Sequence, residues 1–152
     1  MKYAKTRTYK YCLKKDFVIE LKQFPFSGFD QVRSNYAYIR RMNHSNPKCI
    51  LSVLEGYRWD GSSGPTIDTK NTMIPSLIHD VLYQLLRESK FPGLNKKQLS
   101  KVRKWADWEY YRALRREGMS YIRARVHYYA LRVFGSSSAN PKNRHVVKEV
   151  EV

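Results

Sequence analysis

Three polar side chains in the second half of the sequence have the types and spacing of a general-base site. His79 and Tyr83 are four residues apart in a segment of helical periodicity, so they share one helical face. Asp107 borders the apolar stripe of the next predicted helix, and antiparallel packing of the two helices would let its carboxylate face His79. A carboxylate that holds one imidazole nitrogen leaves the other nitrogen free to act as a base, and Tyr83 can donate to the same carboxylate.

A metal site is predicted beside this set. Asp80 is rotated by about 100° from His79 around the helix, which leaves its carboxylate free for a hard cation that prefers oxygen ligands. The upstream loop 56–65 is rich in glycine and small polar residues, and its backbone carbonyls are the natural additional ligands.

These motifs resemble phospholipase A2. That family carries His-Asp-x-x-Tyr on one helix, an Asp on an antiparallel partner helix and a glycine-rich calcium loop upstream. Here the sequence reads GSSGP at 61–65, HDVLY at 79–83 and WADW at 105–108, in the same order. The resemblance spans about residues 56–115 and is strongest to the disulfide-free viral type, because the chain has only two cysteines.

The resemblance implies a role for each matching residue. His79 would activate water, Asp107 and Tyr83 would hold the histidine, and the metal ligands would be Asp80 for Ca²⁺ with carbonyls near Gly61 and Gly64. Two features depart from the family: the loop lacks the form Tyr-x-Gly-x-Gly, and a minimal phospholipase has no counterpart of the N-terminal strands.

A second resemblance covers more of the chain, about residues 8–135. The order Gly56, Trp59, DGSS at 60–63, Pro75, HDVLY at 79–83 and Asp107 is similar to a phage and prophage family catalogued as domain of unknown function 1353 (DUF1353). This resemblance implies a phage-encoded protein and supplies no activity. It also adds Asp60 to the predicted metal site.

Every member of the set also has an ordinary structural explanation. His79 could be a hydrogen-bonded helix residue, and Tyr83 could be a core residue with its hydroxyl at the rim. Asp107 could form an ordinary ion pair with Arg103 or Arg58. Asp60 could cap a turn in which Gly61 has a positive φ.

The charge of the chain favours an anionic partner without identifying it. Lys plus Arg is 29 and Asp plus Glu is 13, which gives a net charge of +16. The richest stretch is 95–134, yet the sequence has no helix-turn-helix, zinc-finger or RNA-recognition signature. No apolar run approaches the length of a membrane span, and the basic N-terminus lacks the apolar region of a secretory signal.

Three functions follow from these observations. The first is a Ca²⁺-dependent, phospholipase A2-like hydrolase that acts at an anionic interface of membrane phospholipid. The second is a non-catalytic phage structural or assembly protein that contacts virion components, with the His/Asp cluster as a structural network. The third is a non-specific nucleic-acid-binding protein that uses the basic helices of 95–134. The expected location is the host cytoplasm or the virion of a phage.

The 152 residues fit a single α+β domain with a β-rich part at 8–60, a helical part at 73–135 and a tail at 136–152. Alternating and β-branched patterns predict an antiparallel β-meander, and Cys12 and Cys49 fall in strand-like runs as buried, reduced thiols. The predicted strands are Thr8–Lys14, Phe17–Lys22, Ser34–Met42 and Lys48–Leu54.

Three C-terminal α-helices are predicted after the loop. The first begins near Pro75 and ends near Ser89, and the second begins at the Asn95 cap and is closed by Gly118. The third spans Ser120–Phe134. Its predicted inward residues are Ile122, Val126, Tyr129, Ala130 and Val133.

Overall fold

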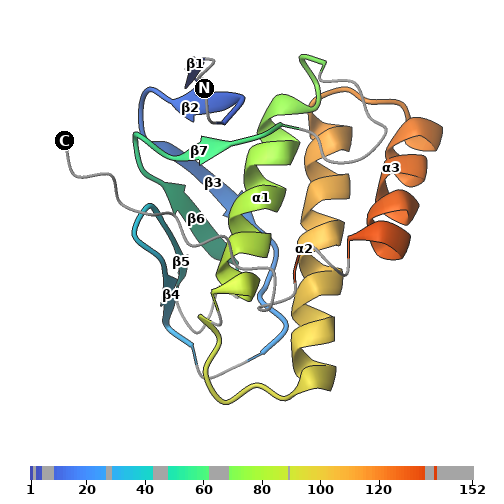
Figure 1. Ribbon diagram of the computed structural model, residues 1–152. Coiled ribbons are helices and arrows are strands. Elements are labelled where there is room, and N and C mark those ends of the chain that lie inside the picture. Colours follow the sequence, from blue (N-terminus) through green and yellow to red (C-terminus); the bar gives the residue numbers. More distant parts are fainter. Residues whose placement is uncertain are drawn as a thin grey trace.

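Strands in the N-terminal part and three helices in the C-terminal part confirm the α+β prediction (Figure 1). The computed structural model describes residues 1, 3–4, 9–26, 29–42, 48–61, 69–88, 90–135 and 139, and of 3–4 only the backbone. The strands are β1 (Tyr3–Ala4), β2 (Tyr11–Leu13), β3 (Phe17–Leu21), β4 (Gln31–Arg33), β5 (Ala37–Arg41), β6 (Cys49–Val53) and β7 (Arg58–Trp59). The helices are α1 (Met73–Arg87), α2 (Lys96–Arg116) and α3 (Tyr121–Phe134).

The strands form two antiparallel sheets instead of the one predicted meander. One sheet has the order β1-β2-β7 and the other has the order β3-β6-β5-β4. The strands β4, β5 and β6 do pair as a meander, but β3 joins β6 and β2 joins β7. Local alternation predicts where a strand lies, whereas the pairing of Tyr11 with Trp59 depends on contacts far apart in the sequence.

The helix ends follow the predicted signals closely. Asn95 caps α2: its side chain accepts from the backbone of Gln98, and the Gln98 side chain accepts from the backbone of Asn95. Gly118 follows α2 with φ at +85°, a conformation that glycine adopts without strain. The helix α1 begins at Met73, so Pro75 lies in its first turn, where backbone N–H groups have no partner within the helix.

The three helices lie side by side next to the sheets (Figure 1). The helix α1 is nearest the sheets, α2 packs antiparallel beside α1, and α3 lies on the outer side of α2. One hydrophobic cluster joins residues of both sheets with α1 and α2, and a smaller cluster joins α2 to α3. The free cysteines Cys12 and Cys49 are buried, as predicted. Among the described residues, no helix is long and apolar enough to cross a bilayer.

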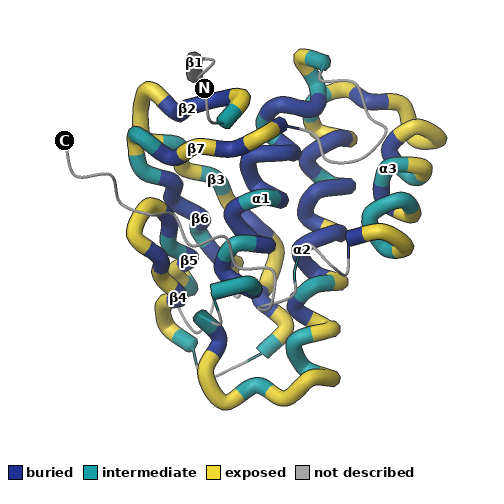
Figure 2. The backbone as a smooth tube through the Cα atoms, viewed as in Figure 1, coloured by how far each residue is buried: buried dark blue, intermediate teal, exposed yellow. Residues whose placement is uncertain are grey.

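The predicted inward face of α3 is wrong. The helix buries Ala124 and Tyr128 against α2, whereas most of the predicted face is exposed and Ala130 is only partly buried (Figure 2). Small Ala124 allows the helices to approach, and the Tyr128 ring packs edge-on against Trp108 and Tyr111. The helix α3 packs mainly against α2 and buries only a narrow face there, so its more apolar face is left exposed.

Candidate functional site

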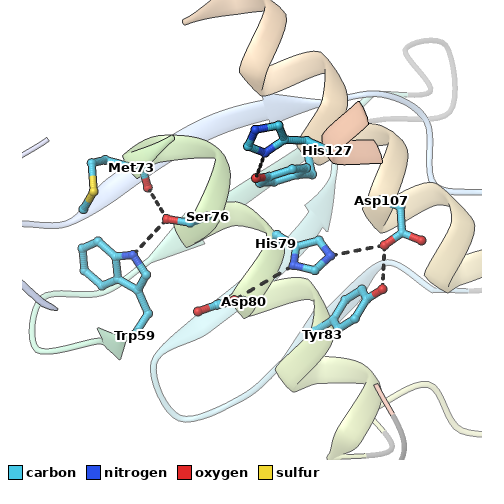
Figure 3. A network of polar contacts seen from close by, with 9 residues as sticks. Trp59, Met73, Ser76, His79, Asp80, Tyr83, Asp107 and His127 are labelled. Atoms are coloured by element: carbon cyan, nitrogen blue, oxygen red, sulfur yellow. Dashed lines mark hydrogen bonds and ion pairs between the residues drawn. The ribbon is translucent and has the colours of Figure 1, made fainter. Parts of the chain in front are cut away.

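The antiparallel packing of α1 and α2 brings the predicted catalytic residues together. Nε2 of His79 lies 3.2 Å from Oδ1 of Asp107 across the interface (Figure 3). The hydroxyl of Tyr83, one turn further along α1, donates to the same oxygen at 2.6 Å. The contacts expected from the i, i+4 spacing of His79 and Tyr83 and from the antiparallel partner helix are therefore present.

A fourth member of the network comes from α3. Nη1 of Arg132 donates to Oδ2 of Asp107 at 2.6 Å, so both carboxylate oxygens are bound. The ion pair of Asp107 is therefore with Arg132 and not with either predicted alternative, Arg103 or Arg58. Arg132 was missed because the predicted inward face of α3 pointed elsewhere. Its one available signal was its position beside the truly buried Tyr128, one turn earlier on the same helix.

The network holds Asp107 as an anion. Asp107 is fully buried, and burial alone would raise its pKa, but hydrogen bonds from His79, Tyr83 and Arg132 outweigh that effect and lower the pKa below its ordinary value of 3.8. Burial and the neighbouring Asp107 anion raise the pKa of Tyr83, so its hydroxyl stays protonated and acts as a donor. An ionised Asp107 requires a donor at Nε2 of His79, which assigns the N–H of the neutral imidazole to that nitrogen.

The other imidazole nitrogen faces Asp80. Nδ1 of His79 lies 4.0 Å from Oδ1 of Asp80, too far for a direct hydrogen bond (Figure 3). The Asp80 side chain is partly exposed, whereas the His79 side chain is almost completely buried. The tilted ring of Tyr83 packs against the imidazole with 3.9 Å between centroids. The histidine is therefore fixed in direction, with Nδ1 on the side of the more accessible carboxylate.

The end of α3 lies directly against this network. A Cβ atom at Gly135 would fall 2.6 Å from the Tyr83 hydroxyl and 2.6 Å from the carbonyl of Leu131. Neither the backbone carbonyl nor the hydroxyl, which is held by Asp107, can move away easily. Glycine is needed at 135 for this close approach and not for its φ, which is −75°.

Of the four predicted metal ligands, the structure describes Asp60, Gly61 and Asp80. Asp60 is exposed, and its Oδ1 accepts from the backbone N–H of Lys10 at 3.3 Å, which ties β7 to the start of β2. Gly61 has φ at +83°, as its predicted turn role requires. Gly64 lies outside the described residues. In the described part of the chain, no group of three or more His, Cys, Asp or Glu could hold a metal ion.

Trp59, next to Asp60 in the sequence, anchors β7 to the start of α1. Its indole Nε1 donates to the hydroxyl of Ser76 at 3.2 Å, and that hydroxyl donates to the carbonyl of Met73 at 3.0 Å (Figure 3). Ser76 lies one turn before His79 on α1. Trp59 is thus fixed to α1 one helical turn before His79.

A second buried carboxylate on α2 was not predicted. Glu109 is 1% exposed, accepts from the backbone N–H of Lys22 at 3.1 Å, and pairs with Arg112 through both oxygens. Burial raises its pKa above the ordinary 4.5, even though Arg112 opposes that shift. Its partners join α2 to the end of β3, and none of them is a general base.

No protein-family model, no curated protein and no solved structure is significantly similar to this chain. The resemblances to phospholipase A2 and to the phage family therefore stay predictions that depend on the short motifs themselves.

Proposed function

We propose that this chain is a hydrolase in which His79 acts as the general base on water, and that its substrates are phospholipid esters at an anionic interface. The observation that carries the proposal is the 3.2 Å contact of His79 Nε2 with a carboxylate that two further side chains hold in place. The resemblance to phospholipase A2 supplies the reaction class, and the net charge of +16 favours an anionic surface.

The proposed step begins with the neutral imidazole. Nδ1 of His79 takes a proton from water, and the resulting hydroxide oxygen bonds to the ester carbonyl carbon. The imidazolium then carries N–H groups on both nitrogens, and the Asp107 anion stabilises its positive charge through Nε2. When the tetrahedral intermediate collapses, the ester C–O bond breaks and the proton on Nδ1 passes to the leaving alcohol.

Calcium at Asp80 remains part of the proposal by resemblance only. Asp80 supplies a partly exposed carboxylate beside Nδ1 of His79, which is suitable for a hard cation. Gly64, one of the predicted carbonyl ligands, lies outside the described residues. No proposed step uses the ion, and titration with Ca²⁺ tests whether fatty-acid release requires it.

The test is release of fatty acid from phosphatidylglycerol vesicles by the purified protein, with millimolar Ca²⁺ or with a chelator. His79→Gln retains an amide that can donate to Asp107 but lacks the base, so release should be lost while the fold is kept. His127→Gln is the matched control, because His127 is a partly buried histidine that bonds Tyr110 instead of Asp107. No release by the unaltered chain under either condition would contradict the proposal.

One observation favours a second candidate, the non-catalytic phage assembly protein. His79 is 4% exposed and Asp107 is completely buried, which also suits a network that only fixes helix packing. In this case His79→Gln lowers the melting temperature, and neither the unaltered chain nor the variant releases fatty acid. The proposed setting in either case is a phage-encoded protein in the host cytoplasm or the virion, for which the second motif resemblance is the support.

A further inference from the structure

The outer face of α3 carries a stripe of exposed apolar side chains. We call Ile122, Val126, Tyr129 and Val133 the outer stripe; they are 74%, 62%, 54% and 67% exposed. Their spacing of four, three and four residues aligns them along one side of the helix. Isolated exposed apolar residues are common on protein surfaces, but a continuous line of them along a whole helix indicates an interaction surface.

The helix cannot rotate to bury this stripe within the described fold. Tyr128 packs against α2, and Arg132 bonds Asp107 at 2.6 Å from the same side of α3. The outer stripe lies on an adjacent face, roughly a third of a turn around the helix from these two residues. Turning the stripe inward would break the bond of Arg132 to the buried Asp107, so the site network itself keeps the outer stripe exposed.

The charge along α3 indicates the kind of partner. The helix has no acidic residue, and Arg123 and Arg125 flank the outer stripe on its two sides. The guanidinium of Arg125 lies over the rings of Tyr121 and Tyr129, 5.4 and 5.5 Å from their centroids. Arginines and tyrosines at the edge of an apolar stripe place cationic and hydroxyl groups where lipid headgroups would lie.

We infer that the outer stripe docks onto an anionic phospholipid surface, with α3 lying parallel to the bilayer plane. The complementarity of an apolar face flanked by cations with an anionic headgroup layer favours this occupant over a protein groove. The choice of phospholipid, as the substrate class, rests on the proposed hydrolase function. The outer stripe and Arg132 are on different faces of α3, and no stripe residue is a member of the proposed catalytic network, so the two can be changed separately.

The test compares two valines of equal exposure. Val126 lies in the outer stripe and Val18 lies on β3, 62% and 61% exposed respectively. The unaltered chain should bind phosphatidylglycerol vesicles at least about tenfold more tightly than phosphatidylcholine vesicles in a sedimentation assay. Val126→Gln should weaken phosphatidylglycerol binding at least about fivefold, and Val18→Gln should leave it unchanged. Circular dichroism should confirm that both variants fold, since neither side chain is in the core.

Several outcomes would overturn the inference. These are absence of phosphatidylglycerol binding by the unaltered chain, equal loss in the two variants, and a concentration-dependent dimer that Val126→Gln abolishes in sedimentation analysis. Binding of duplex DNA that needs Val126, without vesicle binding, would assign the stripe to a different polyanion and also overturn it.

Different results would contradict the hydrolase proposal and the docking proposal. His79→Gln should bind vesicles as the unaltered chain does. Stripe-dependent binding without any fatty-acid release would contradict the hydrolase and leave docking standing. Hydrolysis of a dispersed short-chain phospholipid, with no stripe-dependent vesicle binding, would contradict docking alone.

Discussion

Two buried carboxylates on α2, only two residues apart, have pKa values shifted in opposite directions. Asp107 and Glu109 are 0% and 1% exposed, and burial acts to raise the pKa of both. Asp107 accepts from side chains on α1 and α3, and its pKa is lowered. Glu109 points to the opposite side of α2, toward the end of β3, and its pKa is raised.

Burial alone does not decide the direction in which the pKa of a carboxylate shifts. Asp107 has three side-chain donors, whereas Glu109 has one guanidinium and one backbone N–H. Only Asp107 has an imidazole among its partners, and a histidine is the side chain suited to proton transfer near neutral pH. The same residue class on the same helix is therefore a structural link in one place and part of a candidate base in the other.

Removal of the Asp107 side chain should give the largest effect. Asp107→Ala leaves three donors without their shared acceptor in a buried site, and we expect a loss of about 3–5 kcal/mol in the free energy of unfolding. Urea unfolding followed by circular dichroism measures the loss. A change of less than about 1 kcal/mol would mean that the network contributes little to the fold.

The second largest contrast in stability should be between variants of the two arginines that pair with these carboxylates. Arg132→Gln removes a charged donor from an ionised carboxylate and should cost about 2 kcal/mol. Arg112→Gln should cost about 1 kcal/mol or less, because Glu109 can become protonated more easily than Asp107. Equal losses for the two variants in urea unfolding would remove the distinction between the two carboxylates.

Glu109→Gln should have the smallest effect on stability at neutral pH. The amide oxygen can still accept from the backbone of Lys22, and the cost of burying a charge disappears. We expect a change within about 1 kcal/mol in urea unfolding. A loss as large as that of Asp107→Ala would show that Glu109 is held as firmly as Asp107.

The pH dependence of these effects should have opposite signs. The lowered pKa of Asp107 gives stability that is fully present above its ordinary value of 3.8 and is lost as pH falls through the folded value. The raised pKa of Glu109 gives a contribution to stability that is greatest below its ordinary pKa of 4.5 and declines as pH rises through the pKa of the folded state.

Urea unfolding at a series of pH values measures this contrast. The stability difference between the unaltered chain and Asp107→Asn should shrink below pH 3.8. The free energy of unfolding of the unaltered chain, relative to that of Glu109→Gln, should rise as pH falls toward 4.5. Parallel curves for the two variants would contradict the assigned directions.

Much of the helical part could be predicted from the sequence because its signals are local. The Asn95 capping box and Gly118 define α2, and the i, i+4 spacing of His79 and Tyr83 fixes their shared face. The contact with Asp107 required only that α1 and α2 pack antiparallel, which a short connection between helices favours.

The rest depends on contacts that local patterns do not encode. The rotation of α3 follows from Tyr128 and Arg132 reaching α2, whereas the apolar count alone favours the face with Ile122 and Val126. The same error concealed Arg132 from the site. The second sheet depends on the pairing of Tyr11 with Trp59, which are brought together by the whole fold.

The most direct measurement is the rate of fatty-acid release from phosphatidylglycerol vesicles by Asp107→Asn and by Glu109→Gln. If Asp107 holds the catalytic His79, the first variant should lose about 10²–10⁴-fold in kcat, and the second should stay within about twofold of the unaltered chain. Equal rates for the two variants, or no release by the unaltered chain, would contradict the proposed role of the His79–Asp107 pair.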